Sequence, residues 1–386
     1  MKRLKYPLSI FVVWHPQFQQ GKTIANEIYS LFCRDIERPL SRGLGIPVYF
    51  RSTSYLPIDK NEASRNAVIL LIEENFMTDV GFREFTKSLV NLIDDNTRVY
   101  PVALCEQAFG IGCGLTSIQF VRTSKGHFNF NEDFDLNLKK IKTELLHDLA
   151  RLLMNFRPIW MDDKGEKIPS PVKLFLSHAK KDGEDATKRF KAFVEAETKL
   201  DVFFDAVDIA DGYLFEQQIE ANIKNSALVV FHTDEYSSRE WCRIEVLIAK
   251  RNKCSIVVVH DIKNGEKRAF PYLGNTPTLA LKQQEIESFY EIVNLTLYQV
   301  LNNKYQLELL ESFEENFKRD GVEFIRLSSP PELFNYIDIY KKKKDSKSRL
   351  IVLYPEPPLG IEELKILNEI ETDIEFITPI HLPTLN

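Results

Sequence analysis

The segment from Ser237 to Glu245 carries a tryptophan and a carboxylate four residues apart, Trp241 and Glu245, directly after an apolar stretch. Ser237 and Glu240 have the spacing of a capping box, so we expect a helix to start here, with Glu240 occupied by backbone donors. Residues four apart share a face of a helix, which places Trp241 beside Glu245. An ionised carboxylate held beside a bound ligand can stabilise positive charge that develops there during a reaction.

This helix needs a surface to pack on. Its expected apolar stripe consists of Ile244, Leu247 and Ile248, which would dock the helix on a sheet and leave Glu245 where the stripe meets a cleft. A half-buried carboxylate in that place is costly without a partner. The structural alternative is that a nearby Lys or Arg pairs with Glu245.

A strand-to-helix loop is expected next to this helix. The apolar run that starts at Lys173 ends in polar residues from Ser177 to Asp182, before a helix expected to begin near Gly183. A loop between a strand and a helix exposes backbone donors that suit an anionic or ribosyl ligand.

A second strand, residues 202–204, runs into an acidic loop from Asp205 to Gly212. Three motifs now stand in order along the chain: FLSHAKKD, FFDAVDIADG and SREWCRIE. In this order and spacing they resemble a Toll/interleukin-1 receptor (TIR) domain. The resemblance covers residues 172–275, roughly a quarter of the chain.

The resemblance implies a flavodoxin-like, doubly wound parallel sheet. In enzymatically active TIR domains, a glutamate at the position of Glu245 supports cleavage of the nicotinamide–ribose bond of NAD+. By the same resemblance Trp241 would help to seat Glu245, and the substrate would be bound by Ser177, His178, Ala179, Lys181, Asp182, Asp205 and Gly212. NAD+ is then a substrate, and we expect neither a cofactor nor a metal ion, since His178 has no second ligand at metal spacing.

One carboxylate is sufficient for this chemistry. Nicotinamide in NAD+ is a cationic pyridinium that leaves as a neutral molecule, so no general acid has to protonate it. The remaining demand is to stabilise positive charge on the ribose, which an ionised Glu245 near that ring would meet. Plainer roles stay open for the others, with Asp182 as a helix N-cap, Ser177 as a turn residue and Trp241 as part of the core.

The first part of the chain repeats the pattern of the second. Residues 9–15 are an apolar stretch that ends in a histidine, as are residues 173–178. The next two apolar stretches also correspond, residues 46–50 with 201–204 and residues 66–71 with 225–230. We therefore expect the first domain to be a divergent TIR-like copy whose loops differ in length.

That first copy lacks the chemistry of the second. Arg51 stands where Asp205 would be, and residues 81–85 contain no tryptophan and no convincingly aligned glutamate, so we expect it to be catalytically silent. A competing interpretation is a nucleotide-binding P-loop that ends in Gln-Gly-Lys-Thr at residues 20–23. Its first glycine would fall at Pro16, and proline lacks the N–H that a phosphate cradle needs.

We divide the chain into four parts: a divergent TIR-like domain (1–158), a linker (159–171), the TIR domain (172–305) and a small α/β C-terminal region (306–386). The linker is polar, with a glycine and two prolines. Helical patterns at residues 137–156 and 280–305 would close the two larger domains. In the C-terminal region we expect a strand at 349–354, a helix at 362–370, a strand at 374–377 and a solvated loop at 341–344.

Composition agrees with a globular protein. The chain of 386 residues is 44% hydrophobic and 27% charged, with a formal net charge of −6, so binding to nucleic acid or to a membrane surface is not expected. Five cysteines without a CxxC pair suit a reducing cytoplasm. We expect neither a signal peptide nor a membrane span.

Two classes of function remain. In the first, the protein is an NAD+ glycohydrolase that gives nicotinamide and ADP-ribose or a cyclic ADP-ribose. The resemblance implies a bacterial antiphage immune effector, active when TIR–TIR contacts make a homo-oligomer, with a protein or small-molecule trigger at the N- or C-terminal region. In the second, the TIR domain is a non-enzymatic scaffold that recruits signalling partners. The intact WCRIE motif favours the enzyme, because a scaffold has no need of Glu245.

Overall fold

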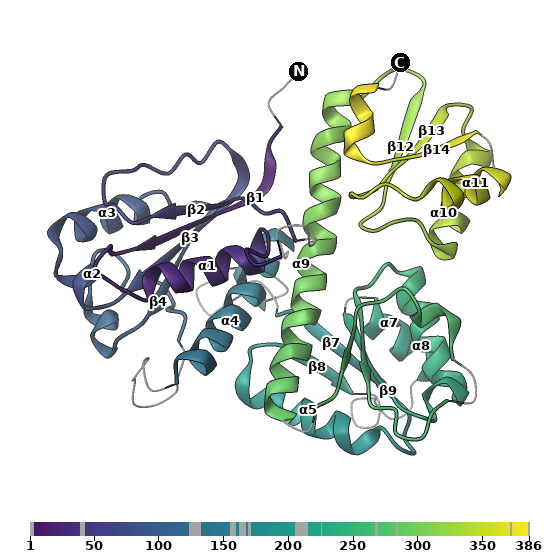
Figure 1. The fold of residues 1–386 in the computed structure, drawn as a ribbon, viewed down its shortest axis with the longest axis horizontal. Helices are drawn as coiled ribbons and strands as arrows, with labels where there is room; N and C mark the ends of the chain where they lie inside the picture. Colours follow the sequence, from purple (N-terminus) through teal and green to yellow (C-terminus); the bar gives the residue numbers. More distant parts are fainter. Residues whose placement is uncertain are drawn as a thin grey trace. The chain divides into compact units, whose positions relative to one another are not determined.

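The computed structural model describes residues 4–38, 43–122, 133–154, 160–161, 167–168, 171–204, 215–224, 226–266, 269–282, 285–370 and 373–384. The chain divides into two compact units, residues 2–155 and residues 156–386. Both are built from parallel sheets covered by helices, which confirms the expected α/β class (Figure 1). Among the described residues, no helix is long and apolar enough to cross a membrane.

The first unit contains a four-stranded parallel sheet in the order β2-β1-β3-β4. Its elements are β1 (Tyr6–Trp14), α1 (Gly21–Phe32), β2 (Val48–Arg51), β3 (Ala63–Ile72), α2 (Glu74–Thr78), α3 (Val80–Val90), β4 (Thr97–Ala103), the 3-10 helix η1 (Glu106–Gly110) and α4 (Phe134–Met154). Strands β1 and β3 are buried over nearly their whole length, because the central strands of a parallel sheet are covered on both faces. They are therefore continuous apolar runs in the sequence.

The segment that mimics a P-loop is a helix start with a packing role. Helix α1 begins at Gly21, with Gln20 as its N-cap. A Cβ atom on Gly21 would lie 2.3 Å from Cδ1 of Trp14, a separation that real Cβ atoms do not adopt. The glycine thus permits the close approach of α1 to β1, and this packing accounts for it without a phosphate ligand.

The second unit begins with a five-stranded parallel sheet in the order β11-β10-β9-β7-β8. Its elements are β7 (Lys173–His178), α5 (Glu184–Glu197), β8 (Asp201–Phe204), α7 (Phe215–Ile223), β9 (Ala227–His232), the 3-10 helix η2 (Tyr236–Ser238), α8 (Glu240–Arg251), β10 (Ile256–His260), the 3-10 helix η3 (Pro271–Leu273) and β11 (Thr278–Ala280). The strand order reverses between β7 and β9. In open α/β sheets a ligand crevice lies at the carboxyl ends of the strands beside such a reversal.

The two sheets share strand order and direction over four strands, since β2-β1-β3-β4 matches β8-β7-β9-β10. Val13 pairs with Arg51 as Leu176 pairs with Phe204, and each of Val13 and Leu176 lies two residues before its histidine. The counterpart of Asp205 is therefore the residue after Arg51. The predicted equivalence of Arg51 and Asp205 is wrong by one position, although neither candidate in the first unit is a carboxylate.

A third parallel sheet, in the order β12-β13-β14, lies in the C-terminal region of the second unit. The elements of this region are α9 (Glu285–Phe317), β12 (Val322–Arg326), α10 (Leu333–Asp345), β13 (Arg349–Leu353), α11 (Ile361–Ile370), β14 (Ile374–Ile377) and the 3-10 helix η4 (Pro379–Thr384). Helix α9 packs on both β10 and β12. It therefore joins this sheet to the five-stranded one.

Two expectations for this region are wrong. The helix expected at residues 280–305 is α9, a single helix of 33 residues that continues to Phe317. Residues 341–344 are not a loop, because they form the last turn of α10, where lysines complement the partial negative charge of a helix C-terminus. Of the expected linker, the described residues form a short antiparallel pair, β5 (Trp160–Met161) with β6 (Lys167–Ile168).

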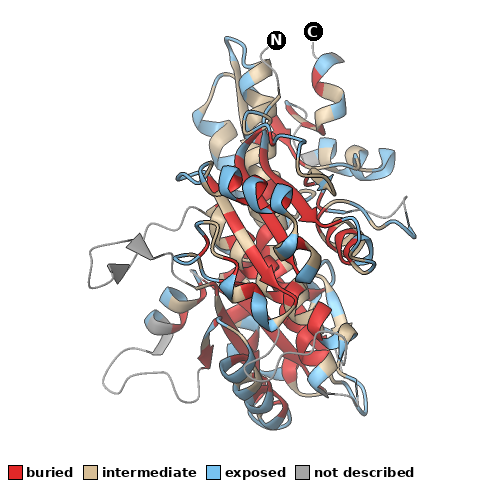
Figure 2. Ribbon diagram, turned by 90° about the vertical axis from the view of Figure 1, so that its left-hand side faces the viewer, coloured by how far each residue is buried: buried red, intermediate tan, exposed pale blue. Residues whose placement is uncertain are grey.

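The buried residues follow the sheets (Figure 2). In the five-stranded sheet, one core cluster joins Phe175 of β7 to Val230 of β9 and to Tyr236, Val246 and Ala249 on the segment that follows. This cluster fixes η2 and α8 on the sheet. The elements that hold the conspicuous motif are thereby anchored in the core.

Candidate active site

Ser177 and Glu245, far apart in the sequence, meet at the carboxyl edge of the sheet. Ser177 is the penultimate residue of β7, and Glu245 lies on the second turn of α8, which packs against β7. Their relative exposures are 1% and 4%. The Ser177 hydroxyl donates a hydrogen bond to Oε2 of Glu245. A carboxylate is thus held at the end of a strand that borders the reversal in strand order.

The buried face of α8 is not the predicted stripe. The buried residues are Cys242, Glu245, Val246, Ala249 and Lys250, whereas Ile244, Leu247 and Ile248 are only partly buried. The buried residues of α8 recur at intervals of three and four positions, as on one face of a helix, but this face includes the polar side chain of Glu245. Hydrophobicity alone therefore does not identify it. As a result, Glu245 lies within the buried face of the helix and not at its edge.

The predicted capping box does not form. Helix α8 begins at Glu240, and its N-cap, Arg239, makes no side-chain cap hydrogen bond. Ser237 belongs to the separate turn η2, and its hydroxyl donates to Oε1 of Glu266 at 2.5 Å. The prediction is wrong because the partner of Ser237 lies 29 positions away in the sequence.

Trp241 is 42% exposed, while Glu245, one turn further on, is buried. The alternative in which Trp241 is a core residue is therefore wrong. A large exposed aromatic ring beside a buried carboxylate is suited to contact a ligand that bears a ring.

Tyr236 is the residue of the site that the sequence analysis missed. Its hydroxyl lies 2.6 Å from Oγ of Ser177 and 3.4 Å from the carbonyl oxygen of Cys242. Tyr236 is fully buried, and burial raises the pKa of its phenol well above the ordinary value. The phenol therefore stays protonated at neutral pH. No sequence signal finds this residue, because the contact joins positions 59 apart.

Asp182 supports the loop after β9. It accepts hydrogen bonds from Oγ1 of Thr233 at 2.7 Å and from the backbone N–H of Glu235 at 3.1 Å. The alternative role of Asp182 as a helix N-cap is wrong, because Gly183 is the N-cap of α5. Lys181 pairs with Glu235 at 2.5 Å, and this hydrogen bond is the main cause that lowers the pKa of the Glu235 carboxyl.

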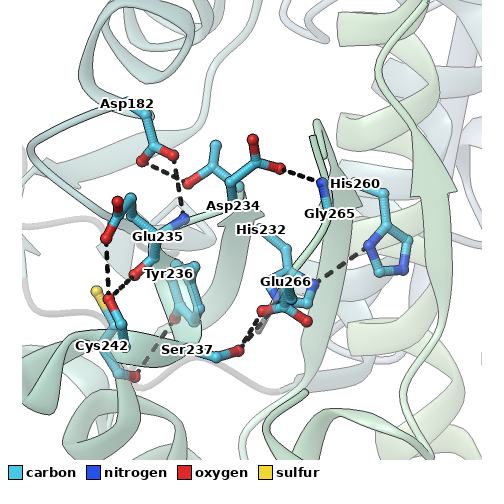
Figure 3. Close-up of polar contacts among 12 residues, drawn as sticks. Asp182, His232, Asp234, Glu235, Tyr236, Ser237, Cys242, His260, Gly265 and Glu266 are labelled. Carbon is cyan, nitrogen blue, oxygen red and sulfur yellow. Dashed lines mark hydrogen bonds and ion pairs between the residues drawn. The ribbon is translucent and has the colours of Figure 1, made fainter. Parts of the chain in front are cut away.

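Two further carboxylates hold the same segment (Figure 3). Asp234 accepts hydrogen bonds from the backbone N–H groups of residues 263–265 at 2.9 to 3.2 Å. Glu266 accepts from Nε2 of His232 at 2.6 Å and from Ser237. Together with Asp182, these carboxylates clamp residues 232–238, the segment that carries Tyr236.

The remaining predicted site residues have varied positions. The His178 ring stacks on that of Phe204, with centroids 4.8 Å apart and planes 9° apart, and Ala179 belongs to the buried core. Asp205 and Gly212 lie outside the described residues. Within the described ranges, no group of His, Cys, Asp and Glu side chains could hold a metal ion.

The fold and the site together define a class of protein. It is a doubly wound parallel α/β domain with a buried carboxylate where the strand order reverses. A family model described as "TIR domain" matches residues 174–293. This part of the chain is a TIR domain.

The chain is also similar to solved structures. The TIR domain of the Toll-related receptor TRR-2 from Hydra magnipapillata is 17% identical, with 31% of this chain and 90% of that chain covered and a TM-score of 0.26. The SEFIR domain of interleukin-17 receptor B is 14% identical, with 32% and 96% covered and a TM-score of 0.25. A putative sugar-binding protein from Salmonella typhimurium LT2 is 8% identical, with 77% and 88% covered and a TM-score of 0.22. No curated protein matches the chain.

Proposed function

We propose that the TIR domain cleaves the nicotinamide–ribose bond of NAD+, with Glu245 as the catalytic residue. The observation that carries this proposal is the buried Glu245 carboxylate at the carboxyl edge of the sheet, with the Ser177 hydroxyl donating to it. Burying a carboxylate costs stability even when it accepts a hydrogen bond. A fold retains such a group most readily where its charge has a use.

The chemistry that this arrangement supports is dissociative. Nicotinamide departs as a neutral molecule, and its bonding electrons neutralise the pyridinium nitrogen. Positive charge then develops on the ribose, where an ionised Glu245 stabilises it. Water forms the new bond to the ribose carbon and releases a proton to the solvent. In a cyclising reaction, an atom of the adenine ring forms this bond instead. Trp241, exposed one turn before Glu245, would contact the departing ring or the ribose.

Among the described residues of the first unit, no carboxylate takes the place of Glu245, which supports our proposal that this unit is a catalytically silent, divergent TIR-like copy. Glu84, in the segment nearest to the WCRIE motif, lies on α3 with its side chain 64% exposed and paired with Lys87 at 2.7 Å. The residue that corresponds to Ser177, when the two histidines are aligned, is Trp14. The positions that correspond to Ser177 and Glu245 therefore carry neither the hydroxyl nor a buried acid, and the buried Glu73 of this unit instead caps α2 through the backbone N–H groups of residues 75 and 76.

The biological part of the proposal follows from the resemblance. We propose a cytoplasmic antiphage effector that depletes NAD+ when TIR–TIR contacts assemble the protein, with the first unit or the C-terminal sheet binding the trigger. The five cysteines are all free, as a reducing compartment favours.

Cellular NAD+ tests this proposal against the scaffold alternative. The full chain, Glu245→Gln and the matched control Glu84→Gln would be expressed to equal levels, and NAD+ and nicotinamide measured over time. We expect the wild type and Glu84→Gln to deplete NAD+, and Glu245→Gln to lose about 100-fold or more of the rate. Assembly would also be enforced by fusion to an oligomerising domain. If NAD+ then stayed undepleted in all three cultures, the result would favour a scaffold.

A further inference from the structure

We propose that Tyr236 is a positioning residue for Glu245, acting through a one-directional hydrogen-bond relay from the Tyr236 phenol to the Ser177 hydroxyl to the Glu245 carboxylate. The catalytic meaning of the relay rests on the proposed function. The relay itself is a statement about three side chains and can be tested without NAD+.

The direction of the relay follows from the count of protons. Ser177 has a single hydroxyl proton, which it donates to Glu245, so its oxygen is left to accept from Tyr236 at 2.6 Å. The carbonyl of Cys242 also faces the phenol, but at 3.4 Å it is the weaker acceptor. Both hydroxyl donors of the relay therefore point towards the Glu245 carboxylate.

This direction favours the ionised form of Glu245. Hydrogen bonds that a carboxylate accepts stabilise its charged state, whereas burial opposes it. The phenol stays a donor because burial raises the pKa of Tyr236 well above its ordinary value. In a chain of hydrogen bonds each donor polarises the next, so the Tyr236 phenol makes the Ser177 hydroxyl a stronger donor.

The tyrosine stands on a rigid support. Asp182 holds Thr233 and Glu235, Asp234 holds residues 263–265, and Glu266 holds both ends of the clamped segment through His232 and Ser237 (Figure 3). Three carboxylates fix residues 232–238 against neighbouring loops. A group that orients a reactive carboxylate needs this kind of fixed position.

The other titratable groups around α8 have contacts of their own. The His232 ring packs edge-on against the Tyr236 ring, with centroids 5.5 Å apart. The Cys242 thiol donates to the carbonyl of His178 at 3.4 Å, and the His178 ring stacks on Phe204. Helix α7 brings Glu220, which pairs with Lys224 just after that helix. Glu332, the N-cap of α10, pairs with Lys250 of α8, Asp338 of α10 pairs with Lys253 just after α8, and η3 brings Tyr272. Tyr236 is therefore the titratable group that the Ser177 contact couples to Glu245.

The direct test is the titration of Glu245 in the full-length protein. Glutamate labelled with 13C at the side-chain carboxyl would be incorporated, and the Glu245 resonance identified by its loss in Glu245→Gln. We expect Tyr236→Phe to raise the midpoint of this titration by about 0.5 to 1 pH unit, and Ser177→Ala to raise it at least as much. Tyr290→Phe is the matched control, since Tyr290 is also buried but its hydroxyl lies 3.4 Å from Glu197.

A second substitution, expected to shift the Glu245 midpoint in the opposite direction, separates the relay from an effect of misfolding. Site-specific 3-fluorotyrosine at position 236 has nearly the same shape but is a stronger donor, so the Glu245 midpoint should fall. A purely structural role for Tyr236 predicts no shift with fluorotyrosine. An unchanged Glu245 midpoint in both the fluorotyrosine protein and folded Tyr236→Phe would overturn the relay.

Nicotinamide release then separates the relay from the proposed function. In an active enzyme, Tyr236→Phe should lower kcat by about 5- to 10-fold, move the acid limb of the pH profile upward and leave KM nearly unchanged. The double variant with Ser177→Ala should lose no more than Ser177→Ala alone, because both act through one contact. If the assembled wild type released no nicotinamide while the titration shifted as expected, the proposed function would fail and the relay would stand.

Discussion

At the scale of single residues, two acidic side chains, Glu245 on α8 and Asp182 in the loop between β7 and α5, have different roles because their surroundings differ. Glu245 is buried and accepts from a hydroxyl 68 positions away, whereas Asp182 is exposed and supports a loop 51 to 53 positions away. The sequence singled out both residues, since their motifs are local. Their roles could not be assigned from it, because the partners are brought near only by the fold.

His260, whose Nδ1 lies 3.2 Å from Nδ1 of His232 in the clamped segment, makes stability depend on pH. Burial, and next the neighbouring charge of His232, lower the pKa of His260 below its ordinary value. The unfolded chain then binds more protons than the folded chain, so stability is present above about pH 6.5 and is lost as the pH falls towards the lowered pKa. We expect His260→Asn to flatten this decline. Thermal unfolding midpoints between pH 5 and 8 would measure it, and an unchanged slope in the variant would refute the assignment.

At the scale of elements, buried parallel strands were the most predictable. The sequence located β7, β9, β13 and β14 to within one or two residues, because strands covered on both faces are unbroken apolar runs. Strand β12 and helix α10 were missed. All five residues of β12 are only half-buried, and α10 ends in lysines that have no apolar period. Exposure on one side weakens the pattern that sequence reasoning uses.

The start of α1 gives a test of element packing. Gly21→Ala would put a methyl group 2.3 Å from Cδ1 of Trp14, so we expect the first unit to lose about 1 to 3 kcal/mol of stability. Gly110→Ala is the matched control, because a Cβ there meets nothing within 4 Å. Chemical denaturation followed by tryptophan fluorescence would compare the two. Similar stabilities for both variants would show that Gly21 serves another purpose.

At the scale of the whole molecule, charged groups join the TIR sheet to the C-terminal sheet within residues 156–386. Lys250 of α8, with its side chain only 8% exposed, pairs with Glu332 at the start of α10 at 2.9 Å. Glu332 also forms a capping box with Asn335. A buried cation that depends on a carboxylate from another element couples the stability of the two elements.

Removing that carboxylate should therefore be costly. We expect Glu332→Gln to lower the free energy of unfolding of this unit by about 1.5 to 3 kcal/mol, because it leaves the Lys250 charge poorly compensated. The exposed pair of Lys253 and Asp338, 3.2 Å apart, is the control, and Asp338→Asn should change stability by less than about 1 kcal/mol. Urea denaturation would compare the variants. Equal effects would mean that the buried pair does not link the two sheets.

The central claim is that Glu245 makes this TIR domain an NAD+-cleaving enzyme. Its most direct test is nicotinamide release by the purified full-length protein, assayed over a range of protein concentrations with a crowding agent to promote assembly. We predict one nicotinamide released per NAD+ consumed, with a specific rate that rises with protein concentration and is lost in Glu245→Gln. Release by Glu245→Gln at the wild-type rate would contradict the claim, as would a wild-type protein that assembles but releases no nicotinamide.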